Sequence, residues 1–384
     1  MPPHLRSALC GAALIGAVSA TGLCPAPASA SVSAGLPSST TTAVSAVAAT
    51  ATSLAPADGS VAALPVPVGF GAATTGGAGG TVIHVTSAAD DASQSGTLPW
   101  ALAQAGPKWI VFDDDMTITL TSPAQVTSET TIDGRGHDVL ITGPGTSGLV
   151  IDGVDNVIVE GLRLRDFGDT ALTSSNDPYD AISVVASTRV WIDHNTLSEA
   201  GDKLIGIQDG TSGVTVSWNH FWDQEQTLQV GEMSTASADV DQTVTIADNW
   251  FDHVGYRMPV VSYGKAHVYN NYLDSWTRYA VRSERLAQIY LEANVFQAAS
   301  SKKATLTTVA QTCNDAGTLC DSRKGFIYDT GNLYLGTTVT AKSRKGKVFD
   351  PSDAYSYTAA EASTDLATVI STGAGADPGA DTDG

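Results

Sequence analysis

Basic residues, cysteines and long apolar runs are all scarce in this sequence. Its 384 residues include 20 Lys and Arg against 40 Asp and Glu, a formal net charge of −20, so nucleic acid is not an expected partner. No segment after the first thirty residues is apolar over the length that crosses a bilayer, and we expect no membrane partner. Only Cys313 and Cys320 lie beyond those thirty residues, which excludes a disulfide-dense scaffold.

The first thirty residues have the order of charge, apolar core and small residues that is typical of a secretory signal. Arg6 precedes an apolar run, and the segment ends in Ala28-Ser29-Ala30. We therefore expect residues 1–30 to be removed and the product to be secreted and extracellular. In an oxidising environment Cys313 and Cys320 would pair in one disulfide, with two unpaired thiols as the alternative.

Three further regions follow from composition. Residues 31–79 are rich in Ala, Ser, Thr, Gly and Pro with Asp58 as the one charged residue, which predicts a flexible linker. Residues 358–384 form a small-residue, acidic tail for which we expect no packed structure. Residues 80–357 are long enough for one large domain, which we expect to be monomeric.

A repeat runs through this domain. Five segments share the pattern apolar-x-apolar-x-x-Asn-x-apolar, and the shared asparagines are Asn195, Asn219, Asn249, Asn271 and Asn294. Alternation of apolar and polar residues before each asparagine is typical of a strand, and the asparagine indicates a bend at a fixed place in each unit.

Such short units can bury their apolar side chains only by stacking on one another, which predicts an all-β parallel β-helix. The asparagine amides would then hydrogen-bond one another and the local backbone along the stack. A sandwich or propeller is the weaker alternative. Asn156 to Leu164 fits an earlier coil, with Leu162 at the asparagine position. Residues 96–105, with Pro99 in the first turn, suit a short helix that caps the open end of the stack.

Several motifs resemble polysaccharide lyase family 1, the pectate and pectin lyases. They occur in family order and are GPKWIVF at 106–112, TIDGRG at 131–136, VWIDH at 190–194, the stretch 202–221, and RMPVVSYGKAHVYNNY at 257–272. The resemblance implies a right-handed parallel β-helix that cleaves the pectic polysaccharide galacturonan by β-elimination.

The resemblance also implies roles for residues that precede successive bends. Asp180 and Asp202 match carboxylates that bind calcium, and Arg257 matches the catalytic arginine. Gln226 stands at the position of a substrate-binding lysine, Ser262 at that of the second arginine of the motif, and Arg282 at that of a further substrate-binding arginine.

One departure weakens the expected calcium site. The third acid position is Gly206, so calcium would need oxygens from Asp177, water or substrate to complete its six to eight ligands. Pectin lyases resemble the same family without calcium and place a cation near this position. Lys203 is adjacent in sequence, but strand alternation should point it away from Asp202.

The reaction explains why these residue types are needed. β-Elimination removes the C5 proton, which is α to the uronate carboxyl group, and requires a base and stabilisation of the charge that develops there. A free guanidinium is effectively always protonated. Arg257 therefore either becomes neutral in its surroundings and takes the proton, or stabilises the carboxylate while hydroxide or another group takes it.

Two other functions remain open at this point. Because of Gly206, Gln226 and Ser262, the chain could be a degenerate β-helix that binds acidic polysaccharide without cleaving it. A pectin hydrolase of the same architecture would require a placed pair of acids, and we find no convincing motif for one. Asp193 and His194 lie within the repeat, where structural hydrogen bonding is the favoured role.

Overall fold

The computed structural model describes residues 53–169, 177–232, 238–299, 306–308 (backbone only), 323–337, 339 and 342–376. All of these lie in the unit that spans residues 50–384. The secretory signal, the first part of the expected linker and the cysteines at 313 and 320 lie outside the described residues, so these expectations stay predictions.

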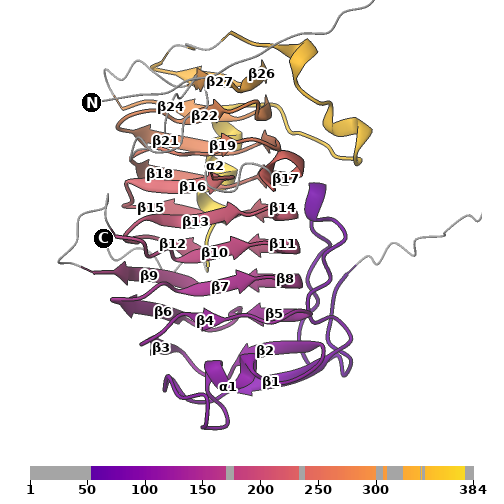
Figure 1. Ribbon diagram of the computed structural model, residues 1–384, viewed down its shortest axis with the longest axis vertical. Helices are drawn as coiled ribbons and strands as arrows, with labels where there is room; N and C mark the ends of the chain where they lie inside the picture. Colours follow the sequence, from indigo (N-terminus) through magenta and orange to yellow (C-terminus); the bar gives the residue numbers. More distant parts are fainter. Residues whose placement is uncertain are drawn as a thin grey trace, which may run out of the picture. The chain divides into compact units, whose positions relative to one another are not determined.

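The described strands form three sheets (Figure 1) in which every strand pairs with its neighbours in parallel. The strands of the first sheet are β1 (Thr81–Val85), β2 (Lys108–Phe112), β5 (Thr130–Asp133), β8 (Asp155–Glu160), β11 (Thr188–Asp193), β14 (Ser212–Ser217), β17 (Thr243–Ala247), β20 (Lys265–Tyr269), β23 (Gln288–Glu292) and β26 (Phe326–Thr330).

The strands of the second sheet are β4 (Ala124–Gln125), β7 (Leu149–Asp152), β10 (Ile182–Val185), β13 (Lys203–Gln208), β16 (Gln226–Val230), β19 (Val260–Ser262), β22 (Val281–Glu284) and β25 (Leu306–Thr308). The strands of the third sheet are β3 (Met116–Thr119), β6 (Val139–Pro144), β9 (Arg163–Gly168), β12 (Thr196–Leu197), β15 (His220–Trp222), β18 (Trp250–Val254), β21 (Tyr272–Trp276), β24 (Val295–Gln297) and β27 (Leu333–Leu335).

Successive coils build the three sheets together, because the chain visits the first, third and second sheet in turn. Equivalent residues of neighbouring coils lie in register, as where Val190 pairs with Val157 on one side and Val214 on the other. This is the parallel β-helix predicted from the repeat.

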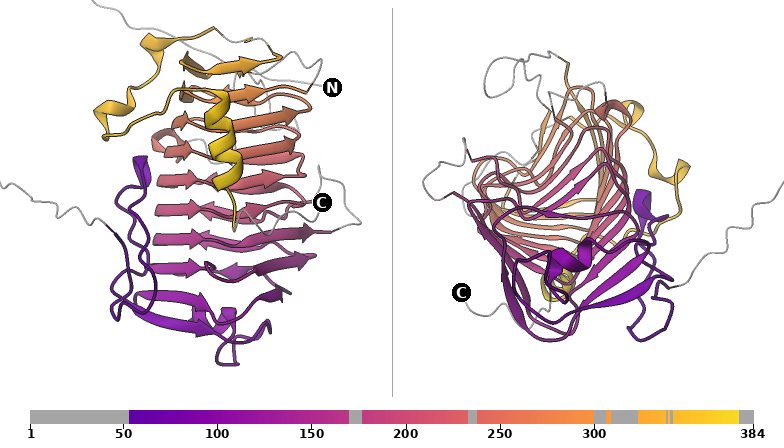
Figure 2. Two further views of the ribbon diagram at one scale, coloured as in Figure 1. Left: turned by 180° about the vertical axis from the view of Figure 1, so that it is seen from behind. Right: turned by 60° about the horizontal axis from the view of Figure 1, so that its bottom comes forward.

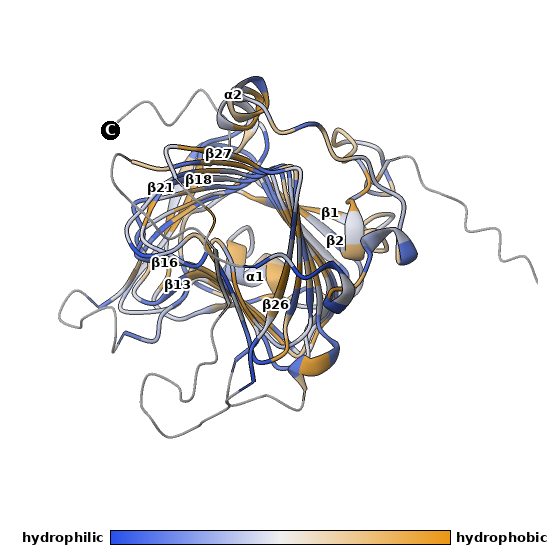
Figure 3. Cartoon of the chain, turned by 90° about the horizontal axis from the view of Figure 1, so that it is seen from above, coloured by the Kyte–Doolittle hydropathy of each residue, from blue (hydrophilic) through white to orange (hydrophobic). Residues whose placement is uncertain are grey.

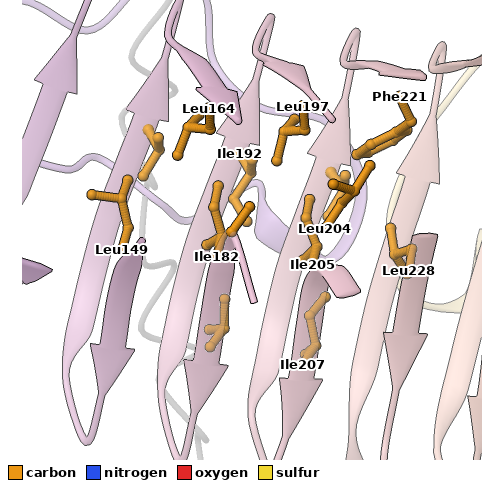
Figure 4. Close-up of a cluster of buried hydrophobic side chains, with 14 of the residues drawn as sticks. Leu149, Leu164, Ile182, Ile192, Leu197, Leu204, Ile205, Ile207, Phe221 and Leu228 are labelled. Carbon is orange, nitrogen blue, oxygen red and sulfur yellow. The ribbon is translucent and has the colours of Figure 1, made fainter. Parts of the chain in front are cut away.

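The interior of the coils is filled by stacked aliphatic and aromatic side chains (Figure 4). Ile182 pairs with Ile205 in the second sheet, and Leu197 pairs with Phe221 in the third, and all four are fully buried. Each such side chain contributes about 1.5–3 kcal/mol through the area it removes from water. The core therefore runs continuously along the stack and holds the sheets at fixed separation.

The repeated asparagines form the predicted hydrogen-bonded ladder at the bends between the first and third sheets. Each side-chain Nδ2 donates to the Oδ1 of the next asparagine, at 3.1 Å from Asn195 to Asn219 and 3.0 Å from Asn219 to Asn249. The ladder continues through Asn271 and Asn294 and ends at Asn332, a sixth member that the repeat pattern did not include. At the other end, the backbone N of Leu162 donates to Asn195 Oδ1, which places Leu162 in the coil as expected.

Two helices lie against the β-helix. The one-turn helix α1 (Leu98–Leu102) begins after Thr97, whose hydroxyl accepts from the backbone N of Trp100, and Figure 3 shows it across the interior of the coils at the β1 end. Helix α2 (Thr364–Gly373) packs on the outer face of the third sheet (Figure 2), where it buries Ile370 against Tyr272 and Val295. The acidic tail expected over 358–384 is therefore packed up to residue 376, because it contains apolar residues at helical spacing.

Short 3-10 turns occur at Gly69–Gly71, Asp239–Asp241, Lys345–Lys347 and Pro351–Asp353.

Residues 53–79 differ from the flexible linker that their composition predicts. Leu54 and Leu64 pair through their backbones and are 2% and 1% exposed, because they cover Trp109, Ile158 and Trp191 on the outer face of the first sheet. Sparse apolar residues are thus enough to hold this segment on the sheet. No helix among the described residues is long and apolar enough to span a membrane.

Candidate active site

The residues predicted for the site lie on neighbouring strands of the second sheet. Asp180 lies two residues before β10, Asp202 directly precedes β13, Gln226 opens β16, Arg257 precedes β19, and Arg282 lies within β22. These strands are hydrogen-bonded in the order β22-β19-β16-β13-β10. Adjacent coils are roughly 4.8 Å apart. Five successive coils therefore carry these residues near the amino-terminal ends of their strands in this sheet.

A lysine that was expected to point away lies between the two aspartates. Lys203 Nζ is 3.2 Å from Asp180 Oδ1 and makes an ion pair with Asp202 Oδ2. The prediction from strand alternation is wrong because Lys203 is the first residue of β13, where the preceding bend and not the pleat sets the side-chain direction. The lysine side chain is 11% exposed, so the pair of charges is largely removed from water.

Burial and charge act in opposite directions on this group of residues. Burial raises the pKa of Asp180 to about 6, although the Lys203 ammonium acts to lower it. Burial alone would lower the pKa of Lys203, but the carboxylates of Asp180 and Asp202 outweigh it and hold that pKa above its usual value. Arg257 is near enough to act on the same lysine with the opposite sign. Lys203 is therefore a fixed cation close to Arg257.

The described side chains do not fit a calcium ion between Asp180 and Asp202. Asp180 Oδ1 accepts from the backbone N and the Nζ of Lys203, and its Oδ2 accepts from Ser183 Oγ at 3.2 Å. Asp202 Oδ2 pairs with Lys203 and its Oδ1 accepts from Gln226 Nε2 at 2.9 Å. Calcium needs six to eight oxygen ligands, whereas here an ammonium lies between the carboxylates.

Asp177, considered as a substitute ligand, is engaged elsewhere. Its Oδ2 accepts from the backbone N of Asp169 at 2.7 Å and its Oδ1 accepts from the backbone N of Tyr179 at 3.1 Å. Both bonds organise the chain before β10, which gives Asp177 a structural role.

Arg257 is half-buried and precedes β19, two coils from Asp202 in the second sheet. Its Nη1 donates to Gln229 Oε1, and its guanidinium carbon is 5.4 Å from the centre of the Tyr256 ring. The backbone O of Arg257 accepts from the backbone N of Leu228 at 2.8 Å, which fixes the residue against β16. These contacts hold the guanidinium against Gln229 and Tyr256.

Two further arginines, Arg278 paired with Glu225 and Arg282 near Glu284, lie against two tyrosines beside Arg257. Arg282 lies with its guanidinium carbon 3.8 Å from the Tyr279 ring centre, and Arg278 lies 4.6 Å from that of Tyr256. Burial raises the pKa of Tyr279 to about 12, while both Arg282 and Arg257 act to lower it. We call Tyr256, Arg257, Arg278, Tyr279 and Arg282 the arginine–tyrosine cluster.

Ser262 lies in the same sheet and is buried. It is 4% exposed, its Oγ donates to Glu284 Oε2 at 3.2 Å, and it accepts from Arg285 Nη1 at 2.9 Å. Arg285 also pairs with Glu284. The contacts of Ser262 are therefore with this buried pair, and Glu284 also lies 3.5 Å from Arg282 Nη1.

Two clusters outside the second sheet could hold a metal ion among the described residues. Glu160, Asp193 and His194 form one at the end of the first sheet, and Asp252, His253 and Asp274 form the other on the third sheet. In the first, Asp193 accepts from Ser217 Oγ and lies 2.6 Å from His194 Nδ1, the structural hydrogen bonding favoured for these residues.

Sequence reasoning missed Lys203, Gln229 and the two tyrosines of the cluster. A usable signal for Lys203 was the glycine three residues later, since a missing side chain on one coil leaves room for a longer neighbour. Gln229 and the tyrosines carried no pattern that separates them from ordinary surface residues.

Comparisons with known proteins find similarity to pectate lyases. Residues 12–378 match a family described as pectate lyase. Pectate lyase 1 of Juniperus virginiana is 37% identical over 246 residues, 60% of this chain and 67% of that protein. Pectate lyase 1 of Cryptomeria japonica is 34% identical over 261 residues, 64% of this chain and 70% of that protein.

Solved structures agree with the sequence relatives. The crystal structure of jun a 1, the major allergen from cedar pollen, superposes with a TM-score of 0.66 at 30% identity, covering 80% of this chain and 92% of that one. A pectate lyase from Bacillus sp. N165 in complex with trigalacturonate has a TM-score of 0.57 at 24% identity, covering 80% and 98% of the two chains, and shows the fold alone.

Proposed function

The chain belongs to the pectate lyase family, and we propose that it cleaves pectic polysaccharide by β-elimination with Arg257 at the reaction centre. The observation that carries this proposal is the placement of Lys203, Gln226 and Arg257 on three successive coils of the second sheet. A galacturonan chain that crosses these coils would meet cations at successive sugars. The alternative of binding without cleavage is not favoured, since the family match and the named relatives are lyases.

The reaction needs a cation at the uronate carboxyl group and removal of the C5 proton. As the C5–H bond breaks, a C4=C5 double bond forms, the C4–O bond to the next sugar breaks, and the leaving oxygen takes a proton from solvent. The guanidinium N–H groups of Arg257 stabilise charge on the carboxyl group as it develops. The C5 proton passes to neutral Arg257 or to hydroxide, and either route predicts a rate that rises with pH in the neutral to alkaline range.

Arg282 and Gln226 have different proposed roles. Arg282 is half-exposed, with its guanidinium carbon 3.8 Å from the Tyr279 ring centre and its Nη1 3.5 Å from Glu284 Oε1, and we assign it to binding a uronate on the neighbouring sugar. Gln226 is 6% exposed and bonded to Asp202, so we assign it to positioning that carboxylate. Ser262 is left out of the proposed contacts because Glu284 and Arg285 engage it.

Secretion is part of the proposal and rests on the signal-like residues 1–30. Expression of the full sequence in a secreting host should place the protein in the medium with a new amino terminus near Ser31. Retention in the cell with Met1 intact would contradict it.

The test of the proposed reaction is the ultraviolet absorbance of unsaturated uronides released from polygalacturonate. We expect product from the wild type and a fall in kcat/KM of at least about 100-fold in Arg257→Ala. Arg189→Ala is the matched control, because Arg189 pairs with Asp155 at the surface of the first sheet and its loss should cost less than about 1 kcal/mol of stability. Wild-type protein that releases no unsaturated product at any pH would refute the proposed function.

A further inference from the structure

We propose that the ammonium group of Lys203 permanently takes the place that a divalent cation would occupy between Asp180 and Asp202, so that this chain acts on polygalacturonate without a metal. The inference rests on the proposed lyase function and deepens it. It assigns Lys203 as the cation that joins Arg257 in holding the uronate carboxyl group.

The first argument is the space at Gly206. A Cβ atom added to Gly206 would lie 2.8 Å from Asp180 Oδ2 and 3.0 Å from Lys203 Cε, closer than side-chain atoms pack. A side chain at position 206 would therefore require the Asp180 carboxylate and the end of the Lys203 side chain to shift. Gly206 leaves the space in which the Lys203 ammonium contacts Asp180 and Asp202.

The second argument is charge. Two carboxylates and one ammonium leave a local charge of −1, and a divalent ion would have to approach an ammonium that already contacts Asp180 and Asp202. Asp180 and Lys203 are both buried, and charges interact more strongly away from water. Burial therefore strengthens the repulsion between the Lys203 ammonium and a divalent ion. Carboxylates that already accept hydrogen bonds from Ser183 and Gln226 would also have to release them.

The third argument is the position of Arg257. Lys203 and Arg257 lie on the same sheet two coils apart, with Gln226 on the coil between them. An ammonium has three donors, and the described contacts to Asp180 and Asp202 account for two of them. The third N–H group of Lys203 and the guanidinium N–H groups of Arg257 are suited to donate to a uronate carboxylate.

The direct test is calcium titration by calorimetry on the chelator-treated full chain. We expect the wild type to show neither calcium binding at millimolar calcium nor a calcium-dependent shift in unfolding temperature that Asp202→Asn removes. The double variant Lys203→Gly, Gly206→Asp removes the ammonium and adds the third carboxylate, and should bind calcium and unfold at a higher temperature in calcium than in EDTA. Should the double variant fail to fold, Lys203→Gly alone serves the same purpose. Calcium binding to the wild type that Asp202→Asn abolishes would overturn the proposal.

Activity provides a second readout that separates this inference from the proposed function. Wild-type rates on polygalacturonate should agree within about twofold in calcium and in EDTA, while Lys203→Met should raise KM more than about tenfold and Lys203→Arg should recover part of the loss. Lys265→Ala, which removes an exposed lysine from the first sheet, is the matched control. Loss of wild-type activity in EDTA would overturn the inference. Absence of product in both conditions would refute the lyase function, and the calorimetry would still decide whether Lys203 excludes calcium.

Discussion

Single buried polar residues determine the path of this chain at its bends. Asn249 Nδ2 donates to the backbone O of Val216 and Ala247 and to Asn271 Oδ1, at 2.9 to 3.0 Å. Its Oδ1 accepts from the backbone N and the Nδ2 of Asn219. An amide is the one small side chain that donates and accepts in this way at every coil. Leu162 is tolerated because it lies where the ladder ends and only its backbone N is needed.

Replacing Asn249 should therefore be costly. Asn249→Ala removes five buried hydrogen bonds across three coils and takes the side-chain acceptor from the buried backbone N of Asn219. Each unsatisfied buried group costs about 1–3 kcal/mol. We expect a loss of at least about 3 kcal/mol in the free energy of unfolding, measured with urea. Asn332→Ala, at the end of the ladder, should lose less. Equal losses at both positions would show that the ladder contributes no more within the stack than at its end.

Glu160 predicts a pH dependence of stability. Burial first, and then the charge of Asp193, raise the pKa of Glu160 well above its usual value, while Arg135 acts in the opposite direction. The folded state thus binds this proton more tightly than the unfolded chain. The stabilisation is complete below the pKa of the unfolded chain and is lost as pH rises through the folded pKa.

The corresponding experiment compares the wild type with Glu160→Gln, which is neutral at every pH. Between about pH 5 and about pH 8 we expect the wild type to lose at least about 1 kcal/mol of unfolding free energy relative to the variant. Urea unfolding at each pH gives the difference. Parallel curves for the two proteins would mean that Glu160 stays ionised in the folded state.

Residue patterns predicted the asparagine ladder but not the position of Lys203 in the site. Asparagine at a constant offset is a periodic signal, and it gave the five bends directly. The position of Lys203 depends on the bend at residues 201–202 and on the space above Gly206, which are features of neighbouring coils and not of the local sequence. A rule for strand interiors failed there because it was applied to a strand end.

At the scale of elements, the segment 53–79 shows why composition misled. Its glycines were taken as a sign of flexibility, but several of them permit close approach to the sheet. A Cβ atom at Gly77 would lie 1.8 Å from the backbone O of Lys108. The backbone N of Gly77 also donates to Thr131 Oγ1, and that of Gly71 donates to Thr215 Oγ1. Low charge and small residues in this segment are therefore compatible with close packing on the outer face of the first sheet.

The packing of segment 53–79 on the first sheet can be tested by substituting one buried and one exposed residue. Leu64 is 1% exposed against Trp109 and its neighbours, so Leu64→Ala should lower the free energy of unfolding by about 2–5 kcal/mol. Val68 is 42% exposed in the same segment, and Val68→Ala should change it by less than about 0.5 kcal/mol. If Leu64→Ala unfolds like the wild type, the segment behaves in solution as the linker that composition predicted.

At the scale of the whole molecule, the repeat was sufficient to predict the architecture, because a unit with short strands has to stack. The charge was not sufficient to predict the partner. A net charge of −20 repels a polyanion, and the arginine–tyrosine cluster with Lys203 provides a local exception on the second sheet. Association with pectate is thus a competition between long-range repulsion and short-range attraction.

This competition predicts an unusual response to salt. The Debye length falls from about 30 Å at 0.01 M to about 8 Å at 0.15 M ionic strength. Repulsion from the whole molecule acts over the longer distance and is screened first, whereas contacts within the partly buried site are screened less. We therefore expect kcat/KM on polygalacturonate to rise severalfold between these two salt concentrations, and kcat/KM on highly methylated pectin, which carries little charge, to stay nearly constant. Initial rates at low substrate concentration measure both. A rate on polygalacturonate that falls over this range would show that the local cations dominate the field even at long distance, and that the net charge of the chain does not govern the encounter.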